Sequence, residues 1–383
     1  MSMKKLSKKM LAVVAAGAMT MGLAMPAFAA DAGEGTKKVT EAYISKTYNT
    51  EVGKAMQFNF TATQDTAGAD LVQKPVACTI PSISFTENET GTTKKVSEAI
   101  KFAPFNEAGK YEYTVKETTS EPAITDSKLE KLIMSKAEYK MTVYVVEDPE
   151  NNFKVDQIVV NKTKNDKGTD EGGKVDISGD ETKNTFNFVN TYVQEAGTGP
   201  DPSKPDPTYN DNGALKVSKT IAAPEGSIDS SATFNFTATF AFPEGTDANT
   251  LGGVKGNEAD VSLTDGTCTF SLKHGQNMKF TGLPVGTKIT VTEAGAANYK
   301  GSASVVLNGG DAKIVAAGKY HEDLTAVDGN KDKLGQNKNT VDVTNTYNHV
   351  PTTGIIMNTL PYVLMIALCG AALFGFVAFK RRR

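Results

Sequence analysis

The sequence predicts an all-β protein in which two β-sandwich domains follow one another along the chain. Three observations lead to this prediction. Segments rich in Val, Thr, Tyr and Phe alternate apolar and polar residues with a period of two, as half-buried antiparallel strands do. Gly, Pro, Asn and Asp separate these segments and mark turns. A set of short motifs also occurs twice, in the same order, once in each half of the chain.

The first 29 residues are predicted to be an export signal that is removed from the mature protein. Four lysines open the chain, and an apolar run follows from Met10 to Ala24. The small-x-small sequence that ends at Ala29 is typical of a signal-peptidase site, so we expect cleavage after Ala29. A retained membrane anchor is the alternative, but the apolar run is short for a bilayer span.

The part between Ala30 and Thr353 is long enough for two ordinary domains. The formal net charge is −3 although both ends of the chain are basic, so the mature part is acidic and nucleic acid is not an expected partner. Cys78 and Cys268 fall one in each half, which rules out a disulfide within a domain. The three histidines are scattered, and we expect neither a metal site nor a cofactor.

We place the first domain at residues 30–193 and the second at 214–349. Residues 194–213 contain four prolines and three glycines and are predicted to form an extended spacer. Within the first domain, Thr125 to Tyr139 carries leucine and isoleucine at helical spacing, which predicts a helix in a crossover segment. The motifs that recur in both domains are Ile/Val-Ser-Lys-Thr, Phe-Asn-Phe-Thr-Ala-Thr, Thr-Val-x-Glu and Asn-Thr-Tyr.

Three strands in each domain carry one polar residue on the face that is otherwise apolar. Residues two apart in a strand point to the same side, so this polar residue is predicted to point inward with its apolar neighbours. The pattern places one lysine, one glutamate and one asparagine in each core. They are Lys46, Glu117 and Asn190 in the first domain and Lys219, Glu293 and Asn345 in the second.

A lone buried charge is costly, so a trio that recurs in two domains indicates chemistry between its members. Burial lowers the pKa of a lysine amine and raises that of a glutamate carboxyl. We expect the neutral amine to attack the asparagine carboxamide, with the protonated glutamate polarising the carboxamide oxygen and ammonia leaving. The product is a Lys–Asn isopeptide bond. In the second domain Lys216 is an alternative nucleophile, although it lies on the opposite face of its strand from Lys219. Exposure of the trios at strand ends is the alternative to burial.

The C-terminal part, residues 350–383, has three elements in a fixed order. Val350, Pro351, Thr352, Thr353 and Gly354 come first, followed by a mostly apolar stretch to Phe379 and a tail of one lysine and three arginines. The apolar stretch is long enough to cross a bilayer, and the terminal cations favour an inside location for the tail. The pentapeptide resembles the Leu-Pro-x-Thr-Gly signals that sortases read, with Val350 in place of Leu. The resemblance implies cleavage between Thr353 and Gly354 and transfer of Thr353 to an amine.

Taken together, the trios and the C-terminal signal resemble the major shaft pilins of streptococci, which are built from isopeptide-linkage domains of the collagen-adhesin B type. The resemblance implies immunoglobulin-like β-sandwich domains and a structural, non-enzymatic subunit of a covalently assembled pilus, anchored to the cell wall. The implied partners are a sortase, other copies of the chain and peptidoglycan. It also implies an acceptor lysine shortly before the last strand of the first domain, which points to Lys183, with Lys162 as second choice.

Two other functions stay open at this point. A basal or minor pilin needs the same domains and sorting signal but no acceptor lysine. An adhesin would bind a host or polysaccharide ligand, and its candidate contact surfaces are the segments Thr66 to Thr92 and Asp323 to Asn339. An enzyme acting on external substrates is not expected, because no catalytic constellation stands out in the sequence.

Overall fold

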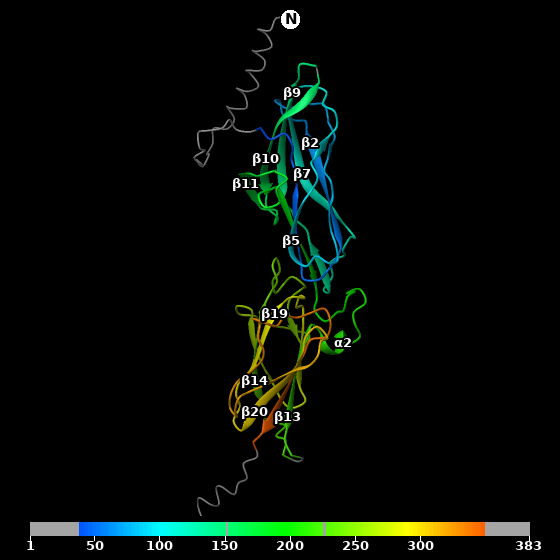
Figure 1. The fold of residues 1–383 in the computed structure, drawn as a ribbon. Coiled ribbons are helices and arrows are strands. Elements are labelled where there is room, and N and C mark those ends of the chain that lie inside the picture. Colours follow the sequence, from blue (N-terminus) through cyan, green and yellow to red (C-terminus); the bar gives the residue numbers. More distant parts are fainter. Residues whose placement is uncertain (1–37, 151, 225–226, 349–383) are drawn as a thin grey trace, which may run out of the picture. The chain divides into compact units, whose positions relative to one another are not determined.

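The computed structural model describes residues 38–150, 152–224 and 227–348. The export signal with its cleavage site at Ala29 and the sorting signal from Val350 onward lie outside the described residues. The described residues divide into two compact units, one within residues 38–194 together with 243–247, and one within residues 195–242 together with 248–348. Apart from one short helical turn, the regular secondary structure described in both units is strand (Figure 1), so the predicted all-β class is confirmed. Among the described residues, no helix is both long and apolar enough to cross a membrane.

The strands of the first unit form two main sheets. The smaller sheet has the order β5 (Gly91–Val96), β1 (Ser45–Thr50), β12 (Asn187–Gln194) and β8 (Glu130–Ile133). The larger has the order β11 (Asp170–Lys174), β10 (Phe153–Lys164), β9 (Glu138–Glu147), β7 (Gly109–Glu121), β2 (Met56–Asp65) and β4 (Ile83–Phe85). A short ladder joins β3 (Cys78–Thr79) to β6 (Lys101–Phe102).

The two sheets of the first unit pack through the alternate residues that the period-two pattern points inward. The ring centroids of Phe60 on β2 and Phe188 on β12 are 5.1 Å apart. Tyr48 on β1 lies 5.3 Å from Phe58 on β2 by the same measure. Rings from both sheets therefore interdigitate, and aromatic contacts of this kind add to the stabilisation from apolar burial.

The second unit repeats this sandwich with a different division of strands. One sheet has the order β16 (Ala259–Asp260), β15 (Lys255–Gly256), β18 (Asn277–Thr281), β13 (Leu215–Ala222), β23 (Thr340–Tyr347), β20 (Tyr299–Val306) and β21 (Lys313–Ala316). The other has the order β17 (Thr267–Leu272), β14 (Phe234–Ala241), β19 (Lys288–Glu293) and β22 (Leu324–Val327). Phe280 of the first sheet packs on Phe240 of the second, with ring centroids 5.3 Å apart.

In both units the first strand of the sandwich pairs in parallel with the last. In the first unit, β1 runs beside β12, and Lys46 stands opposite Phe188. In the second, β13 runs beside β23, and Lys219 stands opposite Val343. The two ends of each sandwich are therefore neighbours in one sheet, and this places residues of the first and last strands side by side on the inner face.

The predicted helix between Thr125 and Tyr139 is wrong. The segment contains strand β8 and the start of β9. Leu132 on β8 is buried and pairs with Tyr192 on β12, whose hydroxyl donates to the Glu130 carboxylate at 2.8 Å. A helix this short is only marginally stable by itself, so completing the open edge of β12 outweighs the helical spacing.

The predicted extended spacer at residues 194–213 is also wrong, because most of it folds onto the second unit. The Ala196 N–H donates to the Leu283 carbonyl at 2.9 Å, and the Gly199 N–H donates to the Gln336 carbonyl at 2.7 Å. Glu195 and Thr198 are buried. The segment ends in one helical turn, α2 (Tyr209–Asn212). Its glycines contributed to the prediction of a spacer, but Gly197 has a structural role in the folded segment. It adopts a φ of 80°, which lets its backbone approach the Gly213 carbonyl closely.

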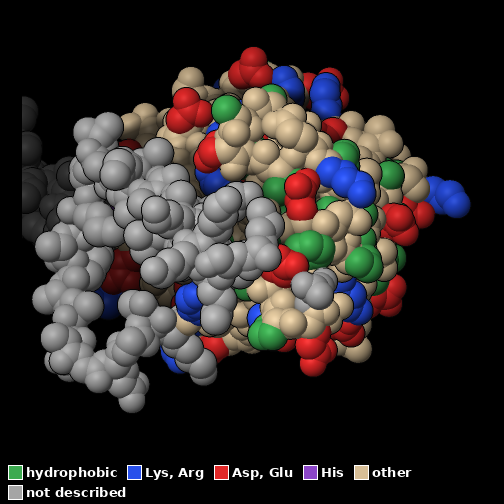
Figure 2. Space-filling view, turned by 90° about the horizontal axis from the view of Figure 1, so that it is seen from above, with side chains coloured by type: hydrophobic (Ala, Val, Ile, Leu, Met, Phe, Trp, Pro, Cys, Tyr) green, Lys and Arg blue, Asp and Glu red, His purple; other side chains and the backbone are tan. Residues whose placement is uncertain are grey.

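Charged side chains of both signs are interspersed over the face drawn in Figure 2. On the first unit, Glu138 forms ion pairs with Lys116 and Lys164, and each lysine Nζ lies 2.9 Å from Glu138 Oε1. Pairs that are exposed to this degree contribute little to stability. They nevertheless show that Lys116 and Lys164 share one carboxylate.

Candidate functional site

The first unit buries Lys46, Glu117 and Asn190 together between its two sheets. The Lys46 Nζ lies 2.7 Å from Glu117 Oε1, and neither side chain is exposed to solvent. Asn190 is also fully buried, and its Nδ2 donates to the same Oε1 at 3.0 Å. The Lys46 amine lies over the Phe58 ring, 4.5 Å from its centroid. A single carboxylate oxygen thus contacts both the amine and the carboxamide nitrogen.

The second unit has the same arrangement. The Lys219 Nζ lies 2.8 Å from Glu293 Oε1, with side-chain exposures of 0% and 2%. Asn345 Nδ2 donates to that oxygen at 3.0 Å. The Lys219 amine lies over the Phe234 ring at 4.1 Å. The trio is therefore built twice with closely matching geometry, and in neither unit does it reach solvent at a strand end.

Strand register explains why the same sequence motifs produce the same site. The lysine and the asparagine stand on neighbouring parallel strands, two positions apart along the pairing, so both point to the inner face. The glutamate comes from the facing sheet, where Glu117 pairs with Phe60 and Glu293 pairs with Phe236. These phenylalanines are the second Phe of the repeated Phe-Asn-Phe motif, and the first Phe supplies the ring under the amine.

Burial shifts the pKa values of both charged members toward their neutral forms. Desolvation lowers the pKa of Lys46 to about 8, against the opposing effect of Glu117. Desolvation likewise lowers the pKa of Lys219 to about 8, against Glu293. Burial also raises the pKa of Glu117 and that of Glu293, although each lysine opposes this. A neutral amine beside a protonated carboxyl is therefore accessible in both units.

Lys216, the alternative to Lys219, lies on the outward face of β13. It is half-buried and stands opposite Lys279 and Thr340 on the two flanking strands. Lys219, by contrast, is buried at the inner face. Only Lys219 shares the interior with Glu293 and Asn345.

The orientation of the asparagine differs from the sequence prediction. We expected the glutamate carboxyl to face the carboxamide oxygen, but in both units the glutamate Oε1 faces Nδ2. In the first unit the carboxamide oxygen instead accepts a hydrogen bond from the Ser135 N–H at 2.6 Å. A backbone N–H can only donate, so an oxygen must face it, and this determines which way the Asn190 amide points.

Sequence reasoning missed Ser135 and the carboxylate that contacts it, Asp166. The Ser135 hydroxyl donates to Asp166 Oδ1 at 2.6 Å. Neither residue belongs to a recurring motif, and a backbone N–H carries no residue-type signal. Only the path of the crossover segment brings Ser135 to Asn190.

The two candidate acceptor lysines differ in accessibility. The Lys183 side chain is 71% exposed and pairs with Asp180 at 3.0 Å. It stands on a turn in which the Lys183 N–H donates to the Asp180 carbonyl. The Lys162 side chain is only 19% exposed and lies near Asp166 and Glu171, at 3.8 and 3.5 Å. Lys183 is thus the more accessible amine of the two.

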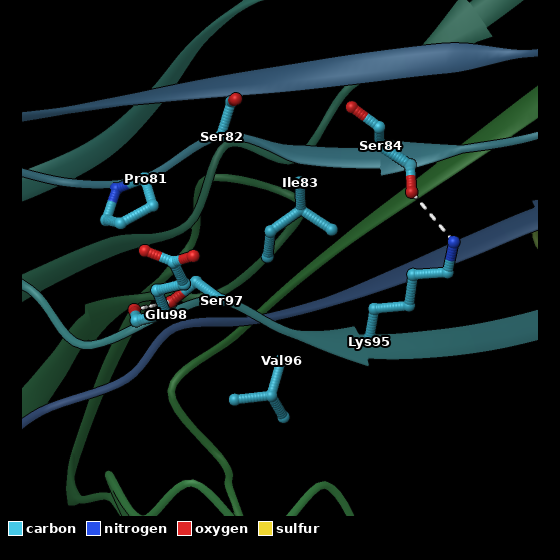
Figure 3. Close-up of a pocket in the computed structure, with 8 residues that line it drawn as sticks. All are labelled: Pro81, Ser82, Ile83, Ser84, Lys95, Val96, Ser97 and Glu98. Carbon is cyan, nitrogen blue, oxygen red and sulfur yellow. Dashed lines mark hydrogen bonds between the residues drawn. The ribbon is translucent and has the colours of Figure 1, made fainter.

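Each of the two surfaces named for an adhesin is partly committed to the fold. Within Thr66 to Thr92, Ile83 and Phe85 are buried. A groove runs beside this segment between β4 and β5 (Figure 3), and Lys95 spans it by donating to the Ser84 carbonyl at 2.8 Å. Within Asp323 to Asn339, the apolar side chains of β22 and Leu334 are buried. Over the described ranges no cluster of His, Cys, Asp or Glu has the makings of a metal site.

Comparisons with known proteins extend these observations. Residues 213–347 match a family model described as a domain of unknown function, DUF7601. A pilin from Streptococcus pyogenes serotype M1 is 26% identical over 372 residues, which cover 92% of this chain and 95% of that protein. The pilus tip adhesin Cpa of S. pyogenes is 32% identical over 119 residues, which cover 31% of this chain and 17% of the adhesin. The crystal structure of the S. pyogenes major pilin aligns over 81% of this chain and 99% of that chain, at 21% identity and a TM-score of 0.30.

The similarity to a pilin extends over nearly the whole chain, so the predicted resemblance to Gram-positive pilins is confirmed. Both relatives are pilus proteins by name, one a pilin and the other a pilus tip adhesin, and this chain is similar to the pilin along nearly its whole length.

Proposed function

We propose that the chain is a subunit of a covalently assembled, wall-anchored pilus and that each of its two units is closed by an isopeptide bond. The bonds join Lys46 to Asn190 and Lys219 to Asn345. The observation that supports this most directly is the burial of the same Lys–Glu–Asn trio at the same register in both units. A purely structural ion pair at these positions offers little net stability, because the desolvation of two charges offsets their attraction.

The proposed reaction is one amide exchange per unit. The glutamate takes a proton from the lysine, which leaves a neutral amine and a neutral carboxyl. The amine nitrogen then attacks Cγ of the asparagine, and the C=O electrons move to Oδ1. The carboxyl, 3.0 Å from Nδ2, delivers its proton there and accepts the surplus proton of the attacking nitrogen. Nδ2 leaves as ammonia, and Lys Nζ and Asn Cγ share a new amide bond. The step occurs once in each unit and has no turnover.

The position of the bonds suits a protein under tension. Each bond would join the first strand of a unit to its last strand, which are parallel neighbours in one sheet. Pulling on the two ends would then load a covalent bond instead of a row of backbone hydrogen bonds. Each bond closes a loop of well over 100 residues, and by analogy with disulfides such a link stabilises the fold by about 5 kcal/mol.

Assembly requires a carboxyl donor and an amine acceptor. The proposed donor is Thr353, released from Gly354 by a sortase that reads Val350 to Gly354. The proposed acceptor is Lys183 of the next subunit, whose amine is exposed on a turn. The last subunit would be joined to peptidoglycan through its own Thr353, which anchors the pilus to the wall.

The intact mass of the mature recombinant chain tests the isopeptide bonds. Each bond removes one ammonia, about 17 Da, so the wild-type chain should be lighter than its sequence mass by two ammonias. Glu117→Ala should restore one of them, and Lys216→Arg serves as the matched control that leaves both bonds in place. A wild-type mass equal to the sequence mass would contradict the proposal.

The acceptor lysine is tested in cells that assemble the pilus. Lys183→Arg keeps the charge but removes the primary amine, so the ladder of covalent polymers should collapse to monomer. Lys338→Arg is the matched control. Lys338 directly precedes the buried Asn339 just before the last strand of the second unit, as Lys183 directly precedes the buried Asn184 in the first. Polymers that persist in Lys183→Arg and disappear in Lys162→Arg would transfer the assignment to Lys162.

A further inference from the structure

We infer that the backbone N–H of Ser135 is an oxyanion-hole donor for bond formation in the first unit and that Asp166 is the residue that positions it. Among the described residues of the second unit, none donates to the corresponding oxygen, so the two bonds are expected to form at different rates. This inference rests on the proposed isopeptide chemistry and concerns how that chemistry is assisted.

The donor lies in a break between two strands. Residues Met134–Ala137 connect β8 to β9 without joining either ladder, and Ser135 is buried within this connection. Freed from strand pairing, the Ser135 N–H turns toward the interior and donates to Asn190 Oδ1 at 2.6 Å. The distance is short for an N–H···O hydrogen bond, and the donor faces the oxygen on which charge would develop.

Asp166 contacts both Ser135, which carries the donor, and the residue next to Asn190, which carries the acceptor. Its Oδ1 accepts a hydrogen bond from the Ser135 hydroxyl at 2.6 Å and another from the Val189 N–H at 2.8 Å. Val189 directly precedes Asn190 on β12. A single carboxylate oxygen therefore ties the crossover segment to the strand that carries the reacting side chain. The Ala137 N–H donates back to the Ser135 hydroxyl at 3.1 Å and completes the turn.

This arrangement would assist the step in which charge moves to the oxygen. When the Lys46 nitrogen attacks Cγ, the carboxamide oxygen becomes an oxyanion, and a pre-positioned N–H stabilises it without reorganisation. Glu117 stays beside Nδ2, where the proton is needed for ammonia to leave. The Ser135 N–H would thus stabilise the oxygen of the carboxamide, while Glu117 would protonate its nitrogen. Removal of one such donor in other acyl-transfer sites costs about 100-fold or more in rate.

The second unit presents a continuous strand at the equivalent place. Asn345 pairs with Gly301, and the ladder between β20 and β23 continues on both sides of this pair. Asn345 Oδ1 is buried and accepts no hydrogen bond from any described residue. We therefore expect the Lys46–Asn190 bond to form roughly tenfold or more faster than the Lys219–Asn345 bond.

A pulse of labelled synthesis tests this in the full chain. Samples are quenched in denaturant at intervals, and peptide mapping follows the two cross-linked peptides separately, so the second unit is an internal control for the first. Asp166→Ala removes the acceptor for the Ser135 hydroxyl and should slow the Lys46–Asn190 bond roughly tenfold or more without changing the Lys219–Asn345 bond. Asp166→Asn removes the same charge but keeps Oδ1, and should restore most of the rate. Ser135→Ala removes the hydroxyl that donates to Asp166, and it should slow formation of the Lys46–Asn190 bond as Asp166→Ala does.

The outcomes separate this inference from the function on which it rests. Equal rates for the two wild-type bonds, or equal behaviour of Asp166→Ala and Asp166→Asn, would overturn the role of the Ser135 N–H. Slowing of both bonds in Asp166→Ala would also overturn it, because that would indicate a general effect on folding. If Asp166→Ala does not fold, the comparison of Ser135→Ala with wild type decides by the same criteria. Absence of ammonia loss from either unit of the wild-type chain would instead contradict the proposed function itself.

Discussion

The two units carry the same buried trio but surround its asparagine differently. In the first unit both polar atoms of the Asn190 carboxamide have partners, Glu117 on the nitrogen and the Ser135 N–H on the oxygen. In the second unit Asn345 has Glu293 on its nitrogen, and its oxygen accepts no hydrogen bond within the described part of the chain. The lysine, the glutamate and the supporting phenylalanine are otherwise alike in position and spacing.

This difference shows which parts of the site come from strand geometry and which come from connections. Strand pairing alone places the amine, the carboxyl and the carboxamide, because all three stand on the core strands that both units share. The donor to the carboxamide oxygen comes from a crossover segment, and the two units cross over differently. Under the proposed chemistry, the two trios can therefore differ in the rate of bond formation although their lysine, glutamate and asparagine are the same.

The largest expected effect is the loss of a cross-link, measured by calorimetric unfolding of Asn190→Ala and Asn345→Ala. In each variant the lysine and the glutamate stay buried beside each other as free side chains. Loss of the proposed cross-link should lower the free energy of unfolding by about 5 kcal/mol. Asn190→Ala also leaves the buried Ser135 N–H without its acceptor, at a further cost of about 1–3 kcal/mol. The first unit should therefore be the more strongly destabilised. An equal loss in the two variants would show that Ser135 contributes no useful hydrogen bond to Asn190.

The next effect concerns a second buried carboxyl of the second unit, that of Glu195. Glu195 is buried, and its Oε1 accepts from the Tyr209 hydroxyl at 2.7 Å and from the Gly282 N–H at 2.8 Å. Burial raises the pKa of Glu195 to about 7, although both hydrogen bonds oppose the shift. Between about pH 4.5 and pH 7 the folded chain thus binds a proton that the unfolded chain has lost. The free energy of unfolding should fall over this interval, by at most about 3 kcal/mol, and then level off.

Glu195→Gln replaces the titratable carboxyl with a neutral carboxamide and keeps an oxygen acceptor. We expect it to raise the free energy of unfolding at pH 8 by about 1–3 kcal/mol and to leave stability at pH 4 nearly unchanged, as measured by urea denaturation at both pH values. Glu130→Gln is the control in the first unit, because Glu130 also accepts from a tyrosine hydroxyl but at a partly exposed position. A gain at pH 4 as large as that at pH 8 would show that charge on Glu195 is not the cause.

The smallest difference between the units is expected for two buried asparagines, which stand six residues before Asn190 and Asn345. Asn184 donates to the Tyr43 carbonyl at 2.8 Å, and Asn339 donates to the Ala214 carbonyl at 3.1 Å, so each ties the approach to the last strand to the approach to the first. Asn339 also accepts from two backbone N–H groups, Asn308 and Gly335, whereas Asn184 accepts from one. Substitution by Ala should cost about 1–3 kcal/mol at Asn184 and somewhat more at Asn339, measured by urea denaturation. The reverse order would contradict the assignment of their cost to these hydrogen bonds.

Much of the fold was predictable because strands leave a direct mark on the sequence. The alternation in Phe58 to Thr63 and in its repeat at Phe234 to Thr239 predicts β2 and β14, and the repetition of motifs predicts two similar units. The helix predicted between Thr125 and Tyr139 failed because the spacing of three apolar residues says nothing about the unpaired edge of β12. The spacer predicted at residues 194–213 failed because its prolines and glycines also suit a segment that is folded against loops.

The sequence by itself determined which side chains meet. A period of two, interrupted by one polar residue on the apolar face of three strands, is sufficient to place Lys46, Glu117 and Asn190 in one interior, and the repeat places Lys219, Glu293 and Asn345 in another. Only the tertiary structure decided the direction of the carboxamide, because that depends on a backbone N–H. Every residue except proline has such a group, and where it points is set by the path of the chain, here by the break at Ser135 and the carboxylate of Asp166.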